Sequence, residues 1–175
     1  EQLLTFSRKN TLAPNRIDIN ASIRDASRLL EQLSREHIRL HIKLCTEPCS
    51  TKIDPDSLIQ ILVNAATNAA DAMPEGGEIT IETSRVQVDG SSSSLDDLEM
   101  EPGEYAVVSV TDTGSGIAED TLERIFEPFF TTKKTGEGTG LGLSTSWAVV
   151  KQVGGYIHMT SELGRGSTLK CFFHF

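Results

Sequence analysis

Four glycines stand at alternate positions in the segment from Thr135 to Leu143, and this segment constrains the fold more than any other. A glycine has no Cβ, so this backbone can approach a ligand closely and adopt positive φ where a turn requires it. The residues that follow, 143–151, read as a helix, and a glycine-rich segment before a helix N-terminus presents free N–H groups to an anion. The segment predicts a phosphate site, but a flexible surface loop explains it equally well. The glycines are Gly136, Gly138, Gly140 and Gly142.

The glycine spacing differs from that of the common nucleotide-binding loops. It lacks the GK[ST] ending of a P-loop and the G-x-G-x-x-G spacing that follows the first strand of a dinucleotide fold. The HRD and DFG signatures of protein kinases are also absent from the sequence. The segment must therefore be interpreted together with other unusual segments of the chain.

Size and charge limit the class of protein. The 175 residues are enough for one domain with a sizeable core. A net charge of −9 argues against nucleic acid as a partner, and it also repels ATP, so a nucleotide site here needs Mg²⁺ or local lysines. No apolar run approaches the ~20 residues that span a bilayer, so we expect no membrane insertion of this chain. The chain begins with Glu, and we expect it to be a fragment of a longer protein.

The three cysteines, Cys45, Cys49 and Cys171, are odd in number. Cys45 and Cys49 lack companions that would complete a zinc site. We therefore expect free thiols in a reducing cytosol.

Hydrophobic periodicity predicts a mixture of helices and strands. The elements do not alternate as regular βαβ units, which favours an α/β two-layer sandwich with a mixed, mostly antiparallel sheet and helices on one face. We expect helices at 20–35, 55–73, 118–125 and 143–153, and strands at 38–44, 51–53, 78–88, 104–112, 156–161 and 167–175.

Local signals refine these elements. Asn20 is a reasonable N-cap for the first helix, and Pro55 suits a helix start. The last two strands form a hairpin around the turn at 164–166. Residues 89–103 contain four consecutive serines and several acids, which predicts a mobile loop.

A polar line runs along the helix predicted at 55–73. Asn64, Asn68 and Asp71 recur at helical spacing, beside a core stripe formed by Leu58, Leu62, Ala65, Ala69 and Ala72. Two asparagines inside a helix cost about 1 kcal/mol relative to alanine. An asparagine amide oxygen is a hard ligand that suits Mg²⁺. The line therefore indicates a metal site, and a solvated helix face is the alternative.

Two further segments carry unusual residues. The sequence DTGSGI at 112–117 follows a hydrophobic strand, where a carboxylate can accept a hydrogen bond from an amine and glycines admit a flat ring. An ordinary Asp-Gly turn explains it as well. Residues 124–134 combine three phenylalanines with Lys133 and Lys134, which suggests a packed loop that brings positive charge to phosphates. A solvated basic pair is the alternative.

In order along the chain, these segments resemble the N, G1, F, G2 and G3 boxes of the histidine-kinase catalytic and ATP-binding domain. The resemblance extends over residues 20–175 and is closest to sensor kinases of the nitrogen-regulation type and related hybrid kinases. It implies the Bergerat fold shared with gyrase, the Hsp90 chaperones and MutL. The matching segments are NAATNAADAM at 64–73, DTGSGI at 112–117, FEPFF at 126–130, GTGLGL at 138–143 and GRGST at 164–168.

The resemblance also implies roles for residues. Asn68 would coordinate Mg²⁺, Asp112 would accept from the adenine amino group, and residues 126–142 would form a lid over ATP. Ser167 or Thr168 would lie near adenine, and the resemblance does not decide between them. The implied catalytic residues are Asn64, Asn68 and Lys133. The implied nucleotide-binding residues are Asn68, Asp71, Asp112, Gly114, Gly116, Ile117, Phe130, Thr139, Gly140, Leu141, Gly142, Leu143, Ser167 and Thr168.

Two positions set this chain apart from its relatives. ATP-hydrolysing members carry a glutamate four residues before the metal asparagine, whereas this chain has Asn64, a poor base. We therefore expect slow hydrolysis and transfer of the phosphoryl group to another acceptor. Many sensor kinases carry Lys or Arg where this chain has Asp71. That acid could act indirectly, with Lys133 supplying the missing positive charge.

By resemblance the phosphate acceptor lies elsewhere. None of the four histidines, His37, His41, His158 and His174, lies in an acidic helical context. We expect residues 1–16 to be the end of a dimerisation helix and a linker, and 17–175 to be the catalytic domain. The implied partners are a histidine-containing dimerisation domain of the same protein, which would be a homodimer, and a response-regulator receiver domain. The implied location is the cytoplasm, including the cytoplasmic part of a membrane-bound sensor.

Two rival functions stay open at this point. The first is a protein serine kinase or ATPase of the same superfamily, against which Asn64 and the FEPFF segment weigh. The second is a degenerate module that senses nucleotide without catalysis, against which the intact boxes weigh.

Overall fold

The computed structural model describes residues 16–33, 37–89, 98–133 and 138–175. The expected end of a dimerisation helix at 1–9 and the expected linker up to residue 15 lie outside these ranges. So do Lys134, Thr135 and Gly136, and most of the serine-rich segment.

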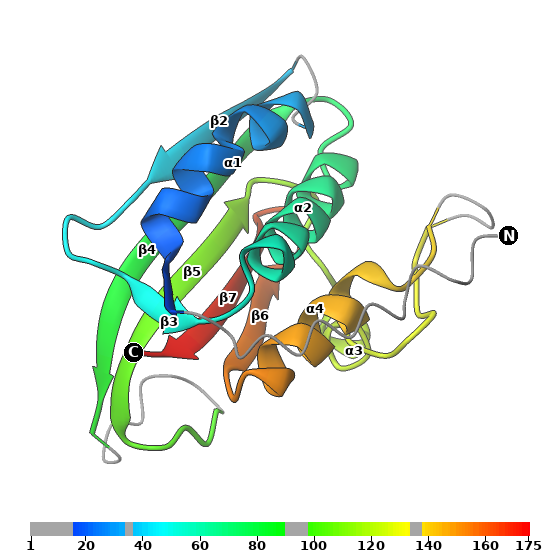
Figure 1. Ribbon diagram of the computed structural model, residues 1–175. Coiled ribbons are helices and arrows are strands. Elements are labelled where there is room, and N and C mark those ends of the chain that lie inside the picture. Colours follow the sequence, from blue (N-terminus) through cyan, green and yellow to red (C-terminus); the bar gives the residue numbers. More distant parts are fainter. Residues whose placement is uncertain (1–15, 34–36, 90–97, 134–137) are drawn as a thin grey trace, which may run out of the picture.

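Within the described residues, the chain forms one main sheet, one small sheet and helices that follow the predicted order (Figure 1). The elements are β1 (Arg16–Asp18), α1 (Ile19–Leu33), β2 (Ile38–Lys43), β3 (Ser50–Lys52), α2 (Pro55–Asp71), β4 (Gly77–Val88), β5 (Gly103–Asp112), α3 (Glu119–Leu122), α4 (Gly142–Gln152), β6 (Tyr156–Glu162) and β7 (Gly166–His174).

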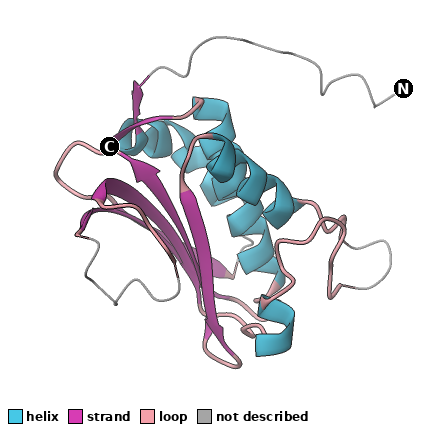
Figure 2. Cartoon of the chain, turned by 90° about the horizontal axis from the view of Figure 1, so that it is seen from below, coloured by secondary structure: helices cyan, strands magenta, loops and turns pink. Residues whose placement is uncertain are grey.

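The main sheet has the strand order β2-β4-β5-β7-β6. β2 and β4 are parallel, and the other neighbours are antiparallel, including the predicted β6–β7 hairpin. The helices cover one face of this sheet, which Figure 2 shows from its end. The predicted two-layer sandwich with a mostly antiparallel sheet is therefore confirmed. β1 and β3 form the small second sheet.

Helix α2 lies between α1 and α4 (Figure 1). Its sequence explains where it begins and which of its faces is buried. The Asp54 side chain accepts a hydrogen bond from the Ser57 N–H at 2.9 Å, and Pro55 occupies the first turn. The predicted stripe of Leu58, Leu62, Ala65 and Ala69 is buried against the sheet. Ala72, the last member of that stripe, is only half-buried because it is the C-cap residue.

The start of α1 differs from the prediction. The helix begins at Ile19, so Asn20 lies inside the first turn and is not the N-cap. Asp18 takes that role, because its carboxylate accepts from the Asn20 N–H at 2.9 Å. The Asn20 side chain is 5% exposed and bridges two segments, donating to the Cys45 carbonyl at 3.0 Å and accepting from the Thr83 hydroxyl at 2.7 Å.

Other element boundaries also shift. Arg16 lies in β1 rather than in a linker, and this strand was not predicted because three residues carry no periodicity. α3 ends at Leu122, three residues before the predicted end. Among the described helices, none is both long and apolar enough to cross a membrane.

A second, smaller hydrophobic cluster covers the other face of the sheet. It consists of Val88, Tyr105, Val107 and Phe172, with Leu98 and Met100 packed against it. The Tyr105 hydroxyl donates to the Glu101 carbonyl at 2.8 Å. The predicted mobile loop at 89–103 is therefore too long, because its last part packs on the sheet.

Candidate functional site

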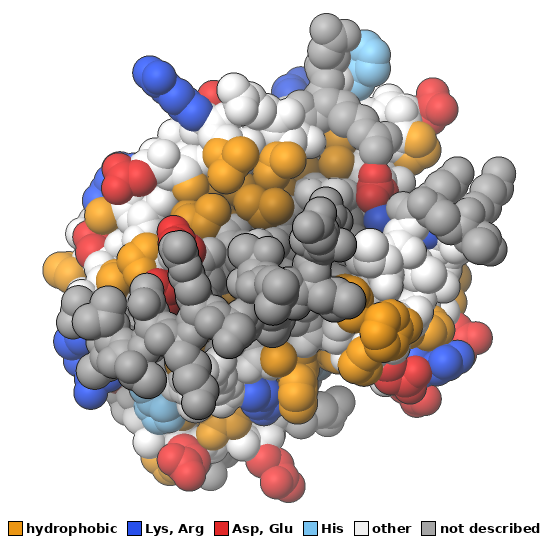
Figure 3. Space-filling model, turned by 45° about the vertical axis from the view of Figure 1, so that its right-hand side comes forward, with side chains coloured by type: hydrophobic (Ala, Val, Ile, Leu, Met, Phe, Trp, Pro, Cys, Tyr) orange, Lys and Arg blue, Asp and Glu red, His pale blue; other side chains and the backbone are white. Residues whose placement is uncertain are grey.

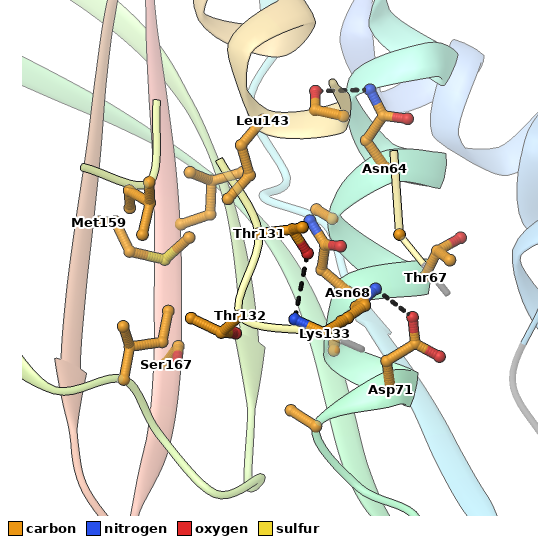
Figure 4. Close-up of a pocket in the computed structure, with 18 of the residues that line it drawn as sticks. Asn64, Thr67, Asn68, Asp71, Thr131, Thr132, Lys133, Leu143, Met159 and Ser167 are labelled. Atoms are coloured by element: carbon orange, nitrogen blue, oxygen red, sulfur yellow. Dashed lines mark hydrogen bonds and ion pairs between the residues drawn. The ribbon is translucent and has the colours of Figure 1, made fainter. Parts of the chain in front are cut away.

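A cavity of about 880 Å³ lies between α2, the inner face of the sheet and the segment that leads from α3 to α4. This volume is typical of a site for a small molecule or cofactor. Figure 4 shows side chains from these elements converging on it. Its lining includes thirteen of the predicted site residues: Asn64, Asn68, Asp71, Asp112, Gly116, Ile117, Phe130, Lys133, Thr139, Gly140, Gly142, Leu143 and Ser167.

The other three predicted site residues do not line the cavity. Thr168 lies between two lining residues of β7, so strand alternation turns its side chain to the outer face, where its hydroxyl meets that of Thr111 at 3.0 Å. Leu141 immediately precedes α4 and is 38% exposed. Gly114 acts through its backbone, because its N–H donates to the Asp112 carboxylate at 2.8 Å.

Asp112 is the last residue of β5 and is only 9% exposed. Burial raises the pKa of its carboxyl, while hydrogen bonds from the backbone N–H groups of Gly114 and Ser167 oppose that rise. The strand end thus places a hydrogen-bond acceptor in a largely apolar part of the cavity. Such an acceptor selects a ligand that carries N–H donors.

The two asparagines of α2 have different surroundings. The Asn64 amide donates to the Gly142 carbonyl at 2.9 Å and to the Ser146 hydroxyl at 3.2 Å, so it ties α2 to the first turn of α4. The Asn68 side chain lines the cavity one turn later and makes no hydrogen bond to any residue that the structure describes. Its amide oxygen is therefore available to a ligand or a cation.

Lys133 and Asp71 form an ion pair across the mouth of the cavity. The Lys133 ammonium lies 2.5 Å from the Asp71 carboxylate, and the two side chains are 31% and 28% exposed (Figure 4). The lysine belongs to the segment between α3 and α4, whereas the acid belongs to α2. The pair therefore joins the two sides of the cavity and places a positive charge close to Asn68.

We call residues 126–133 and 138–141 the lid. Its backbone is held by a hydrogen bond from the Phe129 N–H to the Gly140 carbonyl at 2.9 Å. Both residues have positive φ, 66° for Phe129 and 65° for Gly140. The Phe129 side chain is 74% exposed, and the Phe130 ring lies under the Arg124 guanidinium at 4.4 Å. Figure 3, which brings this side of the molecule forward, shows hydrophobic side chains exposed among charged ones.

Helix α4 begins at the cavity. Gly142 and Leu143, its first two residues, line the cavity, and no side chain caps its N-terminus. The first N–H groups of a helix have no partner within the helix, and the helix dipole adds positive potential there. This helix start is therefore suited to bind an anion such as phosphate.

The sequence did not reveal the apolar part of the cavity. Val110 of β5, Met159 of β6 and Leu169 of β7 lie on its floor, and Ile125 follows α3. Strand alternation was an available signal, since Val110 shares a face with Asp112, and Leu169 shares one with Ser167. Apolar residues such as these cannot be distinguished from ordinary core residues until the position of the cavity is known.

Comparison with known proteins identifies relatives of the whole chain. Residues 53–175 match the family described as "Histidine kinase-, DNA gyrase B-, and HSP90-like ATPase". The sensor kinase CckA of Brucella abortus (strain 2308) is 44% identical over 171 residues, which are 98% of this chain and 18% of that protein. The sensor histidine kinase ZraS of Escherichia coli (strain K12) is 36% identical over 168 residues, which are 95% of this chain and 32% of that protein.

Solved structures show the same fold. The catalytic domain of the histidine kinase ThkA is 28% identical with a TM-score of 0.70, over 91% of this chain and 94% of that one. Full-length ShkA in complex with AMPPNP is 28% identical with a TM-score of 0.71, over 91% of this chain and 30% of that one. This chain thus spans between 18% and 32% of the two curated relatives, and nearly all of a solved catalytic domain.

The family match covers more than half of the chain and includes the helix, strand ends and lid that build the cavity. Its description as an ATPase family implies use of a nucleotide. The chain belongs to the family of histidine kinase-, DNA gyrase B- and HSP90-like ATPases.

Proposed function

We propose that this chain is the ATP-binding catalytic domain of a sensor histidine kinase. It transfers the γ-phosphoryl group of ATP to a histidine on a separate dimerisation domain, for relay to a response-regulator receiver domain. The observation that carries this proposal is the convergence of Asp112, Asn68 and the uncapped start of α4 on one cavity. The named relatives, which are sensor kinases, support it.

The adenine would bind at the buried end of the cavity. Asp112 is an acceptor for the exocyclic amino group, and its carboxylate is held in place by two backbone N–H groups. Gly116 and Ile117 line the cavity beside it, with Ser167 on β7. An apolar floor with one buried acceptor distinguishes adenine from bases that present a carbonyl at that position.

The phosphates would bind at the start of α4. The N–H groups of Gly140 and Gly142 are the proposed donors, and Lys133 adds positive charge. The available amide oxygen of Asn68 fits Mg²⁺, which is a hard cation that takes few protein ligands. Bound Mg²⁺ would neutralise charge on the phosphates, which a chain with a net charge of −9 requires.

Catalysis by these residues would consist of positioning and charge stabilisation. Asn64 is a poor base and its amide is already committed to Gly142 and Ser146, so it would hold the start of α4 rather than activate water. This arrangement disfavours hydrolysis and favours transfer to an acceptor. The proposed full-length protein is a homodimer whose catalytic domain acts in the cytoplasm.

Phosphoryl transfer tests this function directly. The 175-residue chain is incubated with γ-labelled ATP, Mg²⁺ and the separately expressed dimerisation domain of the Brucella abortus relative. Labelling of that domain in an acid-labile, base-stable form is the expected result, because phosphohistidine has that stability. Acid-stable label would indicate a serine kinase. ATP binding without any transfer would indicate a module that only senses nucleotide.

A further inference from the structure

Two thiols lie close together far from the nucleotide cavity. Cys45 and Cys49 occupy the loop between β2 and β3, and their sulfur atoms are 2.9 Å apart. Both are free, as is the buried Cys171 of β7. A disulfide has an S–S length of about 2.05 Å, so an approach of about 0.9 Å would join the two sulfurs.

The two thiols differ in exposure and in ionisation. Cys45 is partly exposed and Cys49 is fully buried. Burial opposes ionisation of Cys45, but hydrogen bonds from Cys49, Thr83 and Asn20 outweigh it and lower the pKa of its thiol. Burial and the adjacent Cys45 raise the pKa of Cys49 to about 12. One member of the pair is therefore a reachable nucleophile, and the other is a protected thiol beside it.

We propose that Cys45 and Cys49 form an oxidisable dithiol that hydrogen peroxide converts into a disulfide. Cys45 loses its thiol proton, and the thiolate attacks one peroxide oxygen. The O–O bond breaks, the leaving hydroxide takes up that proton to form water, and Cys45 becomes a sulfenic acid. The Cys49 sulfur then attacks the Cys45 sulfur and its proton passes to the departing hydroxyl. The S–O bond breaks as water leaves. In total, two thiols and one peroxide give one disulfide and two waters.

The position of the pair gives the disulfide a structural consequence. The Cys49 carbonyl accepts from the Ile19 N–H at 2.8 Å, and the Cys45 carbonyl accepts from the Asn20 amide at 3.0 Å, so both cysteines hold the first turn of α1. Cys49 immediately precedes β3, which pairs with β1. In Figure 1, β3 lies beside the start of α1. Oxidation would therefore fix β3 and strengthen its pairing with β1.

Cys171 provides an internal control. It is fully buried in β7, and burial raises its pKa to about 12, so it should resist oxidation. Its sulfur makes no hydrogen bond to another cysteine among the described residues. A dithiol mechanism therefore predicts that Cys45 and Cys49 react while Cys171 does not.

Peptide mapping after peroxide treatment tests the proposal. Trypsin cleaves after Lys43 and Lys52, so one peptide, residues 44–52, carries both cysteines and no third one. We expect this peptide to lose about 2 Da and both alkylatable thiols at a peroxide dose that leaves Cys171 unmodified. Backbone amides of β1 should then exchange with deuterium more slowly, while those of α4 stay unchanged.

Two variants separate a dithiol from an isolated reactive cysteine. Cys49→Ser should stop the reaction at sulfenic acid on Cys45, detectable with a dimedone probe, and Cys171→Ser should react as the unaltered chain does. If Cys49→Ser prevents folding, peptide mapping of the unaltered chain is sufficient to test the proposal. Reduced Cys45 at a dose that oxidises Cys171, or a disulfide between two chains, would overturn the proposal.

Discussion

The two sides of the cavity differ in how exposed their side chains are. The wall formed by α2 and the inner face of the sheet is buried, with Val110 at 6%, Leu169 at 3% and Asp112 at 9% exposure. The lid opposite exposes 74% of Phe129 and 38% of Leu141. Among the described residues, the lid is joined to its surroundings by partly exposed side chains. Lys133 pairs with Asp71 of α2, and Arg124 pairs with Glu127 and lies over the Phe130 ring.

This difference separates two tasks within one site. The wall carries the acceptor that would recognise the base, so base selection is preformed. The lid and the start of α4 carry the groups that would meet the phosphates. Asn64 holds the start of α4, whereas the lid has more exposed side chains, so the lid can respond to the ligand. Variants of the sheet side of the wall should therefore reduce binding of every adenine compound. Variants of the lid and of the polar residues of α2 should affect only compounds with phosphates.

The largest effect should follow from Asp112→Ala. Loss of a hydrogen bond to a charged acceptor costs about 1.5–3 kcal/mol, or roughly 10- to 150-fold in affinity. Calorimetric titration should show this loss for adenosine and ATP alike. The control is Asp120→Ala, which removes the same charge from an exposed position on α3. If Asp112→Ala weakens binding of ATP but not of adenosine, Asp112 does not recognise the base.

A lid variant, Gly140→Ala, should have the next largest effect. Its φ of +65° costs an alanine about 1–2 kcal/mol, and the new Cβ would collide with the Phe129 backbone. We expect about tenfold weaker ATP binding and unchanged adenosine binding. Gly154→Ala is the matched control, because Gly154 has a φ of +74° and open space around it. If both variants weaken ATP equally, the lid has no specific role.

The ion pair that joins lid and wall should contribute less. Lys133→Met should weaken ATP binding about fivefold or less, because partly exposed charge pairs contribute about 1 kcal/mol. The effect should shrink as salt is raised from ~10 mM to ~1 M. Lys151→Met, which alters an exposed lysine at the other end of α4, should have no effect. Asp71→Asn should strengthen ATP binding slightly in the absence of Mg²⁺, since it removes a negative charge near the phosphates.

The smallest effect should separate two neighbours on β7. Ser167→Ala should weaken adenosine binding about twofold, because loss of one neutral hydrogen bond costs about 0.5 kcal/mol. Thr168→Ala should leave binding unchanged, since its side chain faces Thr111 on the outer face. The reverse order, measured by the same titration, would contradict the placement of the two side chains.

The sequence predicted helix α2 well, and it predicted poorly the features that depend on how distant segments meet. Helix α2 was predictable because its cap, its proline and its apolar stripe all indicate the same helix. The choice between Ser167 and Thr168 was not, because it depends on the register of the β6–β7 hairpin. The Lys133–Asp71 pair joins residues 62 positions apart, and no local pattern could reveal it.

The cysteines show the same limit. The sequence predicted free thiols, and the spacing alone gave no reason to pair Cys45 with Cys49. Their approach to 2.9 Å depends on how the loop between β2 and β3 folds against Asn20 and Thr83. The prediction of Asn20 as an N-cap was wrong, because its side chain bonds to Cys45 and Thr83, which are distant in the sequence.

We propose that Asp112 in the wall binds the base, while Asn68 holds the metal that serves the phosphates. The most direct test is calorimetric titration of ATP with and without Mg²⁺ into the unaltered chain, Asn68→Ala and Asn64→Ala. Mg²⁺ should raise the affinity of the unaltered chain and of Asn64→Ala, and it should leave that of Asn68→Ala unchanged. If the Asn68→Ala chain keeps the full gain from Mg²⁺, Asn68 does not hold the metal.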